Sequence, residues 1–430
     1  MKKEIIICAF ALCVIPSFSQ QSELLKQYRS MALNYSHDLK AAEKNISASL
    51  EVEQMAKAGL KPKLSGDANF QHTGKPIQLT LDLPGMETPV QFEGRDMKYG
   101  ASLTLLQPLY TGGRILETIR IAKHQQSQAA HQAELFRSSI CYQTDIQYWS
   151  TVARKEVVSI TTDFRNSIAS LVKTIREREK VGLVDPQDRL MAEVKLNEAE
   201  YQLLQAQSNF ETGRMALNSL IGVTLQQPTA VDASVPKVNI NDGIGLSGEN
   251  NRPEVKLALD NIKLAESSMK LTDSKYKPQL YIGIDGSYSS PGYDFHSDLD
   301  PNYAVYLKLS VPLFEWGKRK SEKRVSNNRI GMANDQLNKV EDAVRLETET
   351  ARVSLAQAIE QVELSENSLQ KAGENEQKAL ERYAEGKVSV VEVIEAQTYR
   401  QTSQLNYVQA KVKAQGAYSD LIRSLNKYEN

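Results

Sequence analysis

The chain has 430 residues, a formal net charge of −1 and a mean hydropathy of −0.44. The near-neutral charge excludes the broad basic surface of a nucleic-acid-binding protein, so no nucleic-acid partner is expected. Its 41% hydrophobic and 7% aromatic residues are few for a compact globule of this length. This composition favours long helices with narrow apolar seams and two solvated faces.

Residues 1–19 have the pattern of a secretory signal peptide. Two lysines follow the initial Met, residues 5–14 form a short apolar core, and Ser17-Phe18-Ser19 is a small-x-small cleavage site. The core is too short to span a bilayer. A buried N-terminal helix and a lipid-anchored Cys13 stay open as alternatives. After cleavage, Cys141 is the only cysteine left, so no internal disulfide is expected.

Helical spacing predicts two N-terminal helices within residues 20–62, separated by a break near Ser36-His37-Asp38. A single helix is expected over residues 251–277. It is opened by Pro253, because proline suits the first turn of a helix, and it ends where a second proline follows. The preceding residues 223–250 are rich in Pro, Gly, Asp and Asn and are predicted to be a linker.

Two β-hairpins are predicted, over residues 63–107 and 278–311. In each hairpin, two runs of about 9–11 residues alternate between apolar and polar side chains, the length that a tilted membrane-spanning strand needs. The polar side carries Asp67, Asp285 and Lys308, which a water-filled lumen tolerates and lipid does not. A soluble sheet with one buried face has the same alternation. The alternation alone therefore leaves both environments open.

Tyrosines at the strand ends favour the membrane, because aromatic girdles lie at its two interfaces; they are Tyr99, Tyr288 and Tyr303. The Pro- and Gly-rich residues from roughly 73 to 96 are predicted to be a loop. No later stretch of the sequence is apolar enough for a membrane-spanning helix. Four strands cannot close a barrel of their own, so strands in a membrane imply an oligomer that shares one barrel.

The chain contains an internal duplication. The corner from Gln107 to Arg114, which contains Pro-Leu-Tyr and two glycines, returns in altered form from Val311 to Arg319. The same offset of 204 residues relates the corner prolines and separates Gly182 from Gly386. A repeat of this length indicates a duplicated structural unit rather than a solenoid module.

A very long helical hairpin is predicted after each corner, over residues 108–222 and 312–430. Apolar residues recur there at steps of 3, 4 and 7, which is the seam of a coiled coil. The first helix of each hairpin has about 65–70 residues, roughly 100 Å at 1.5 Å per residue. Pro186 is well placed to begin the first returning helix and Gly222 to end it.

Together, these features resemble the TolC-type outer-membrane efflux and secretion channel family over essentially the whole mature chain. The resemblance is carried by the element order, the duplication, the corners, and the segments 217–222, 251–254 and 391–396. It implies a mainly α fold with a small β part. It further implies a homotrimer in which the chains share a 12-stranded β-barrel and a continuous 12-helix α-barrel.

The family also implies a location and partners. The expected location is the outer membrane of a Gram-negative bacterium, with contact to its lipid and an extension into the periplasm. The trimer would be a passive exit duct for efflux or type I secretion, docked to a periplasmic adaptor and an inner-membrane pump of RND, ABC or MFS type. A periplasmic coiled-coil adaptor is the alternative, although adaptors normally carry only one hairpin.

Two acidic residues are the first candidates for a periplasmic gate. Glu392 and Glu395 lie at i and i+3 just after Gly386, so they share one helix face. Three copies of such a face pointing inward would form carboxylate rings that select cations. The family has an acidic pair at these positions, usually aspartates. The alternative is a solvated charged helix face, which the sequence by itself favours.

Asp188 and Tyr383 match family positions that link neighbouring helical hairpins and keep the tip closed; Tyr383 packing at a helix end is the alternative. The family often has a basic residue where this chain has Val388. The turns themselves are the expected adaptor-docking tip: Val181, Gly182 and Leu183 in the first hairpin, and Glu385, Gly386 and Lys387 in the second.

The sequence contains no signature of an enzyme. It has no nucleophile elbow, no P-loop and no metal-ligand cluster, and its five histidines are scattered. No catalytic residue, metal or cofactor is therefore expected.

Overall fold

The computed structural model describes residues 22–81, 84–85, 88–238, 252–292 and 298–428. The predicted signal peptide lies outside the described residues, as does the linker beyond residue 238. The chain divides into two compact units. One contains Met1–Lys40, Leu135–Arg252 and Ala343–Asn430, and the other contains Ala41–Glu134 and Pro253–Asp342.

The two N-terminal helices are α1 (Glu23–Tyr35) and α2 (His37–Ala58). They break at Ser36, where the predicted interruption lies; its ψ of 121° leaves the helical region. The single helix α5 runs over Pro253–Ser274 and begins at the predicted proline.

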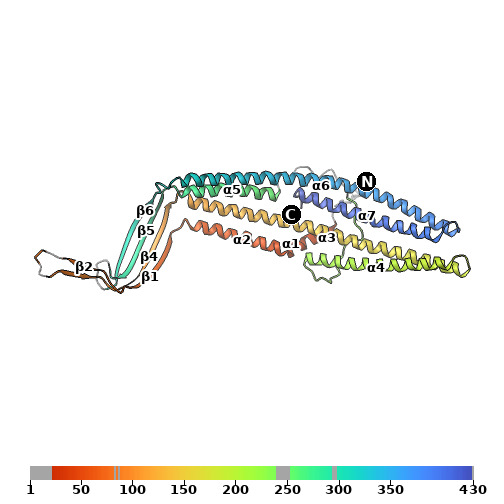
Figure 1. The fold of residues 1–430 in the computed structure, drawn as a ribbon, viewed down its shortest axis with the longest axis horizontal. Helices are drawn as coiled ribbons and strands as arrows, with labels where there is room; N and C mark the ends of the chain where they lie inside the picture. Colours follow the sequence, from red (N-terminus) through yellow and green to blue (C-terminus); the bar gives the residue numbers. More distant parts are fainter. Residues whose placement is uncertain (1–21, 82–83, 86–87, 239–251, 293–297, 429–430) are drawn as a thin grey trace, which may run out of the picture. The chain divides into compact units, whose positions relative to one another are not determined.

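Four long helices form two antiparallel hairpins (Figure 1). The first is α3 (Arg114–Lys180) with α4 (Pro186–Ile221), and the second is α6 (Lys318–Ala384) with α7 (Val390–Ser424). The predicted seam of α6 runs from Ile330 to Val362. Its C-terminal part is buried and packs on apolar residues of α7; this part consists of Ala351, Leu355, Ala358 and Val362. Heptad spacing therefore predicted which face of α6 packs.

The strands β1 (Lys63–His72), β4 (Met97–Tyr110), β5 (Gln279–Ser290) and β6 (Asp300–Ser310) form one antiparallel sheet. Their order is β1-β4-β5-β6, so β4 and β5 join the two predicted hairpins (Figure 1). The register aligns mainly apolar residues in rows across the four strands and mainly polar residues in the rows between, although Leu106 and Ala304 fall in the polar rows. One apolar row is Leu64, Leu105, Ile284 and Val305; the neighbouring polar face carries Ser65, Thr104 and Asp285.

The predicted loop between the first two strands of this sheet is wrong in part. It contains two further strands, β2 (Gln78–Leu81) and β3 (Val90–Glu93), which pair as a separate two-stranded sheet. Their four-residue alternations, such as Gln-Leu-Thr-Leu, were hidden among prolines and glycines. Short strands with so few residues give a weak periodic signal.

A buried polar cluster lies in the unit that contains α1, α4 and α7. The Asp145 side chain is only 1% exposed and accepts two hydrogen bonds from Arg29, at 2.6 and 2.7 Å. It also accepts hydrogen bonds from Ser419 (3.1 Å) and Tyr428 (3.2 Å). Four donated hydrogen bonds compensate for removing this carboxylate from water. Nearby, burial raises the pKa of the Cys141 thiol to about 11, which keeps it protonated and inert.

Among the described residues, no helix is both long and apolar enough to cross a membrane.

Candidate functional site

The turns at Gly182 and Gly386 have the same backbone geometry. Both glycines are left-handed, with φ of 76° and 74°. In the first turn Gly182 donates to the Glu179 carbonyl and Leu183 to the Arg178 carbonyl, each at 2.9 Å. In the second turn, Gly386 donates to the carbonyl three residues earlier and Lys387 to the carbonyl five residues earlier. This is the Schellman ending, in which glycine satisfies the last carbonyls of a helix without a Cβ penalty.

The side chains of the two turns differ. Val181 and Leu183 are 70% and 74% exposed, so the first turn presents two apolar side chains to solvent. In the second turn, Glu385 and Lys387 form an ion pair with each other at 2.5 Å. The predicted tip therefore contains one apolar turn and one charged turn.

An apolar cluster, here called the tip core, joins the two hairpins behind the turns. It contains residues from α3, α4, α6 and α7, namely Phe164, Ile168, Leu171, Val172, Ile175, Ala192, Ala199, Tyr383, Val390 and Val393. Farther from the turns, Gln401 of α7 donates a hydrogen bond to Gln202 of α4 at 3.0 Å. The returning helices are thus held together within one chain.

Tyr383 lies in the tip core and is 7% exposed. Its hydroxyl has no hydrogen-bond partner among the described residues, so the bond to Asp188 that the resemblance implies is not made within this chain. Burial raises the pKa of Tyr383 and outweighs Arg178, which lowers it; half-buried Asp188 adds a smaller increase. The link between Tyr383 and Asp188 remains a prediction for the assembled protein.

Arg178 ties the two hairpins together and was missed in the sequence. Its guanidinium lies 4.6 Å from the centre of the Tyr383 ring and donates to the carbonyls of Tyr383 (3.0 Å) and Ala384 (3.1 Å). It therefore caps the end of α6 from the end of α3. An arginine in the last turn of a helix is a readable capping signal, but it identifies no partner so far away in the sequence.

Glu392 and Glu395 are both exposed on α7, whereas Val393 and Ala396 beside them are buried. Glu392 also has a local role, because it forms a capping box with Ser389, whose backbone N–H donates to its carboxylate at 3.3 Å. The Ser-x-x-Glu spacing was a readable signal for this box. Glu395 has no such partner among the described side chains, so its carboxylate is available to solvent or to another chain.

A network of ion pairs stiffens the first hairpin close to its turn. Arg189 of α4 pairs with Glu179 at 2.9 Å and with Glu193 at 3.0 Å, and Arg176 of α3 pairs with Glu193 at 2.8 Å. Hydrogen bonds from Arg176 and then Arg189 lower the pKa of Glu193. Across the described part of the chain, no group of three or more His, Cys, Asp or Glu side chains is arranged to hold a metal ion.

Comparisons with known proteins identify the family. The family model for outer membrane efflux proteins matches residues 28–223 and 248–427. The toxin and drug export protein A of Aggregatibacter actinomycetemcomitans is 20% identical, with 96% of this chain and 92% of the relative covered.

Two solved structures are similar in fold. The CmeC outer membrane channel of Campylobacter jejuni superposes with a TM-score of 0.77 and 19% identity, over 95% of this chain and 87% of that one. The outer membrane protein VceC of Vibrio cholerae gives a TM-score of 0.76 and 17% identity, over 93% and 95%. These matches are to passive channels rather than enzymes, and the family match extends over most of the sequence. The chain belongs to the outer membrane efflux protein family.

Proposed function

We propose that this protein is the outer-membrane exit duct of a tripartite efflux or type I secretion system. Three chains would share a 12-stranded barrel in the outer membrane of a Gram-negative bacterium and a 12-helix barrel in the periplasm. The duct supplies a path and a gate, and an inner-membrane pump of RND, ABC or MFS type supplies the energy. The name of the relative in Aggregatibacter supports toxins and drugs as cargo.

The observation that carries this proposal is the exposed apolar face of the four-stranded sheet. Its rows of aligned apolar residues include side chains that stay largely exposed, among them Leu64, Leu103, Val305 and Leu307. Contiguous exposed apolar surface marks a contact with lipid or with another protein. The alternating polar face, with Asp67 and Asp285, suits a water-filled lumen. A soluble adaptor would have to cover this apolar face, which disfavours that alternative.

The edges of the sheet support the shared barrel. β1 and β6 each pair on one side only within the described sheet. Unpaired edge strands are closed in stable proteins by further pairing or by cover. Pairing of β6 from one chain with β1 of the next would close the ring, and three chains of four strands give the twelve that the family resemblance implies.

The periplasmic gate is proposed at the free face of α7. Glu392 and Glu395 would form two carboxylate rings in the trimer, which favour cations at a narrow opening. Asp188 and Tyr383 would add the link that keeps neighbouring hairpins together. The exposed first turn, Val181 to Leu183, and the charged second turn, Glu385 to Lys387, would receive the adaptor.

The test is conductance of the detergent-extracted protein in a planar bilayer. Wild type should give small, cation-selective steps, and Glu392→Gln with Glu395→Gln should lose the selectivity. Glu374→Gln with Glu381→Gln is the matched control, because these carboxylates are also exposed near the tip but lie on α6. Equal selectivity in all three proteins would mean that Glu392 and Glu395 form only a solvated helix face and not the gate. Folded oligomer without conductance would contradict the duct itself.

A further inference from the structure

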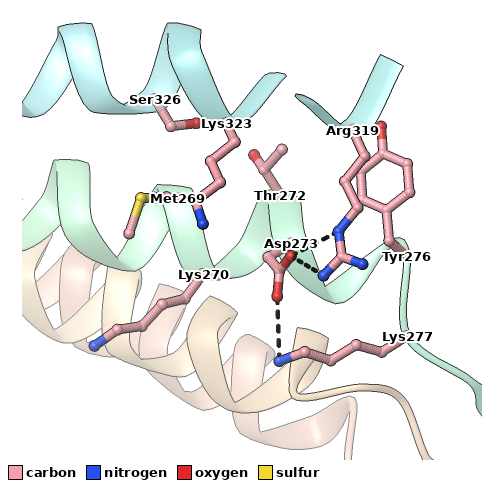
Figure 2. Close-up of a pocket in the computed structure, with 9 residues that line it drawn as sticks. All are labelled: Met269, Lys270, Thr272, Asp273, Tyr276, Lys277, Arg319, Lys323 and Ser326. Atoms are coloured by element: carbon pink, nitrogen blue, oxygen red, sulfur yellow. Dashed lines mark hydrogen bonds and ion pairs between the residues drawn. The ribbon is translucent and has the colours of Figure 1, made fainter. Parts of the chain in front are cut away.

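A basic cavity lies between the end of α5 and the start of α6, within a single unit of the protein (Figure 2). Its volume is about 240 Å³, below the roughly 300–1,000 Å³ of pockets that enclose drug-sized ligands. The lining includes Lys270, Lys277, Arg319 and Lys323 but a single carboxylate, Asp273. The cavity therefore suits a small anionic group.

Asp273 is the only carboxylate in the lining, and Glu322 and Glu315 lie near Tyr276, so the positive charge of the lining is compensated only in part. Arg319 donates to Asp273 at 2.8 Å, and the Lys277 ammonium lies 3.5 Å from its other oxygen. Figure 2 shows these two interactions on one side of the cavity, while Lys323 extends from α6 toward α5 on the other. Lys270 and Lys323 have no carboxylate partner among the described residues. In Figure 2 Lys323 extends into the space between α6 and α5, while Lys270 extends from α5 on the side away from α6, so both add unpaired positive charge to the lining without facing each other.

A hydrogen-bond donor in the same lining points to a ligand as well. The Tyr276 hydroxyl is buried and makes no hydrogen bond of normal geometry within the described ranges; burial and then the nearby Glu322 carboxylate raise its pKa to about 12. A buried hydroxyl without a partner costs free energy, unless a ligand or water accepts its proton. The guanidinium of Arg319 lies 5.8 Å from the centre of the Tyr276 ring. Figure 2 shows the Tyr276 hydroxyl beside Arg319 at one end of the cavity and the Lys323 ammonium at the other, so the positive groups line the cavity rather than meet at one point.

The surrounding chain has the same charge bias over a wider area. Residues 270–277 and 315–324 contain eight Lys or Arg and three Asp or Glu, in a chain whose net charge is −1. Directly before α6, the corner exposes large apolar side chains: Leu313, Phe314 and Trp316, which is 89% exposed. The rings of Phe314 and Trp316 pack edge to face at 4.8 Å. Exposed aromatics followed by a basic cluster are typical of a membrane–water interface.

We propose that this cavity binds the phosphate head group of an anionic phospholipid, such as phosphatidylglycerol, in the inner leaflet of the outer membrane. The inference rests on the proposed function, because it needs β5 and β6 to lie in that membrane. β5 begins two residues after Lys277, and α6 follows the end of β6 by less than ten residues. The cavity thus lies where the strands leave the membrane, at the level of the head groups.

The experiment measures phosphatidylglycerol bound to the purified full-length protein in detergent, by native mass spectrometry. Lys270→Gln with Lys323→Gln should weaken binding on the order of twenty-five-fold, at about fivefold for each lysine near a head group. The matched control is Lys275→Gln with Lys320→Gln, which removes the same charge from exposed positions of the same segments outside the cavity. It should weaken binding less than fivefold. Lys270→Arg with Lys323→Arg keeps both positive charges and should bind the lipid about as well as wild type. That result would show that substitution at these two positions leaves the protein folded.

Three outcomes would overturn the inference. Equal binding of phosphatidylcholine and phosphatidylglycerol would show that the cavity does not select the negatively charged head group. Displacement of the lipid by soluble glycerol phosphate or inorganic phosphate at equal concentration would make the ligand a free anion. Dissociation of the oligomer by the glutamine pair, with unchanged lipid binding, would assign the lysines to a contact with a second copy of the chain.

Conductance in bilayers of phosphatidylcholine alone separates this inference from the proposed function. Wild-type conductance with no selective lipid binding would contradict only the head-group site. Absent conductance in every variant would contradict the duct.

Discussion

The turns at Gly182 and Gly386 share one backbone and differ in chemistry. Both use a left-handed glycine and the same two hydrogen bonds, because this ending satisfies the last carbonyls of a long helix. The first turn exposes Val181 and Leu183, whereas the second pairs its own charges. The difference teaches that a duplicated turn keeps the geometry that its helix requires, while its exposed side chains are free to serve different contacts.

The largest expected effect comes from making the first turn charged. Val181→Asp with Leu183→Asp should weaken binding of the proposed adaptor on the order of a hundredfold or more, since burying each apolar side chain is worth about 1.5–3 kcal/mol. The melting temperature should hardly change, because both side chains are exposed. Glu385→Gln with Lys387→Gln is the control in the second turn. Equal loss of adaptor affinity in the control would remove the proposed asymmetry.

Because the two turns share one backbone geometry, replacing the glycine should destabilise both turns by the same amount. Gly182→Ala and Gly386→Ala should each destabilise the local turn by about 1–2 kcal/mol, because an L-residue is strained in the left-handed region. No heavy atom of the described structure lies within 4 Å of the added Cβ at either position, so backbone strain alone sets the cost. Hydrogen exchange of the turn amides measures it. Clearly unequal costs would show that the assembled protein constrains the two turns differently.

The second turn is expected to depend on a residue of the first hairpin. Arg178→Gln should lower the free energy of local opening at the end of α6 by about 1–2 kcal/mol, because the two hydrogen bonds to its last carbonyls weaken or disappear. Hydrogen exchange should show faster exchange near Ala384. Arg176→Gln is the matched control, because Arg176 pairs with Glu193 inside the first hairpin. The same change in the control would assign the effect to general loss of charge.

The smallest effect is expected at Tyr383. Tyr383→Phe should alter stability little at neutral pH, because the hydroxyl has no partner within the described chain. Burial raises the pKa of Tyr383 above its usual 10, so the folded protein favours the neutral phenol. This contribution is fully present below pH 10 and is lost as the pH rises through the raised pKa. The variant should therefore resist alkaline unfolding slightly better, as circular dichroism across pH 8–12 would show. A larger conductance of Tyr383→Phe at neutral pH would instead support the predicted bond to Asp188 in the proposed trimer.

Local patterns predicted most of the fold. Heptad spacing marked the seam of α6, strict alternation marked the strands of the four-stranded sheet, and Pro186 marked the start of α4. The β2–β3 pair was missed because each strand has only four residues between turn formers. Local signals are strong only where they repeat over many residues.

The candidate site was harder to predict, because its important contacts join distant parts of the chain. Spacing placed Glu392 and Glu395 on one exposed face, and the turn glycines where the helices reverse. It gave no sign that Arg178 would cap a helix end 205 residues later. A single sequence contains the capping group but not the identity of its partner, which packing alone decides.

The buried Asp145 also has a consequence for the order of folding. Residues of the tip core such as Ile175 and Ala192 are close in sequence, so the first hairpin can form soon after its turn is synthesised. The bond from Tyr428 to Asp145 instead joins residues 283 positions apart. Until Ser419 and Tyr428 have been synthesised, this carboxylate lacks two of its four donors. Nascent chains that end before Ser419 therefore contain an unfinished polar centre, which Ser419 and Tyr428 complete.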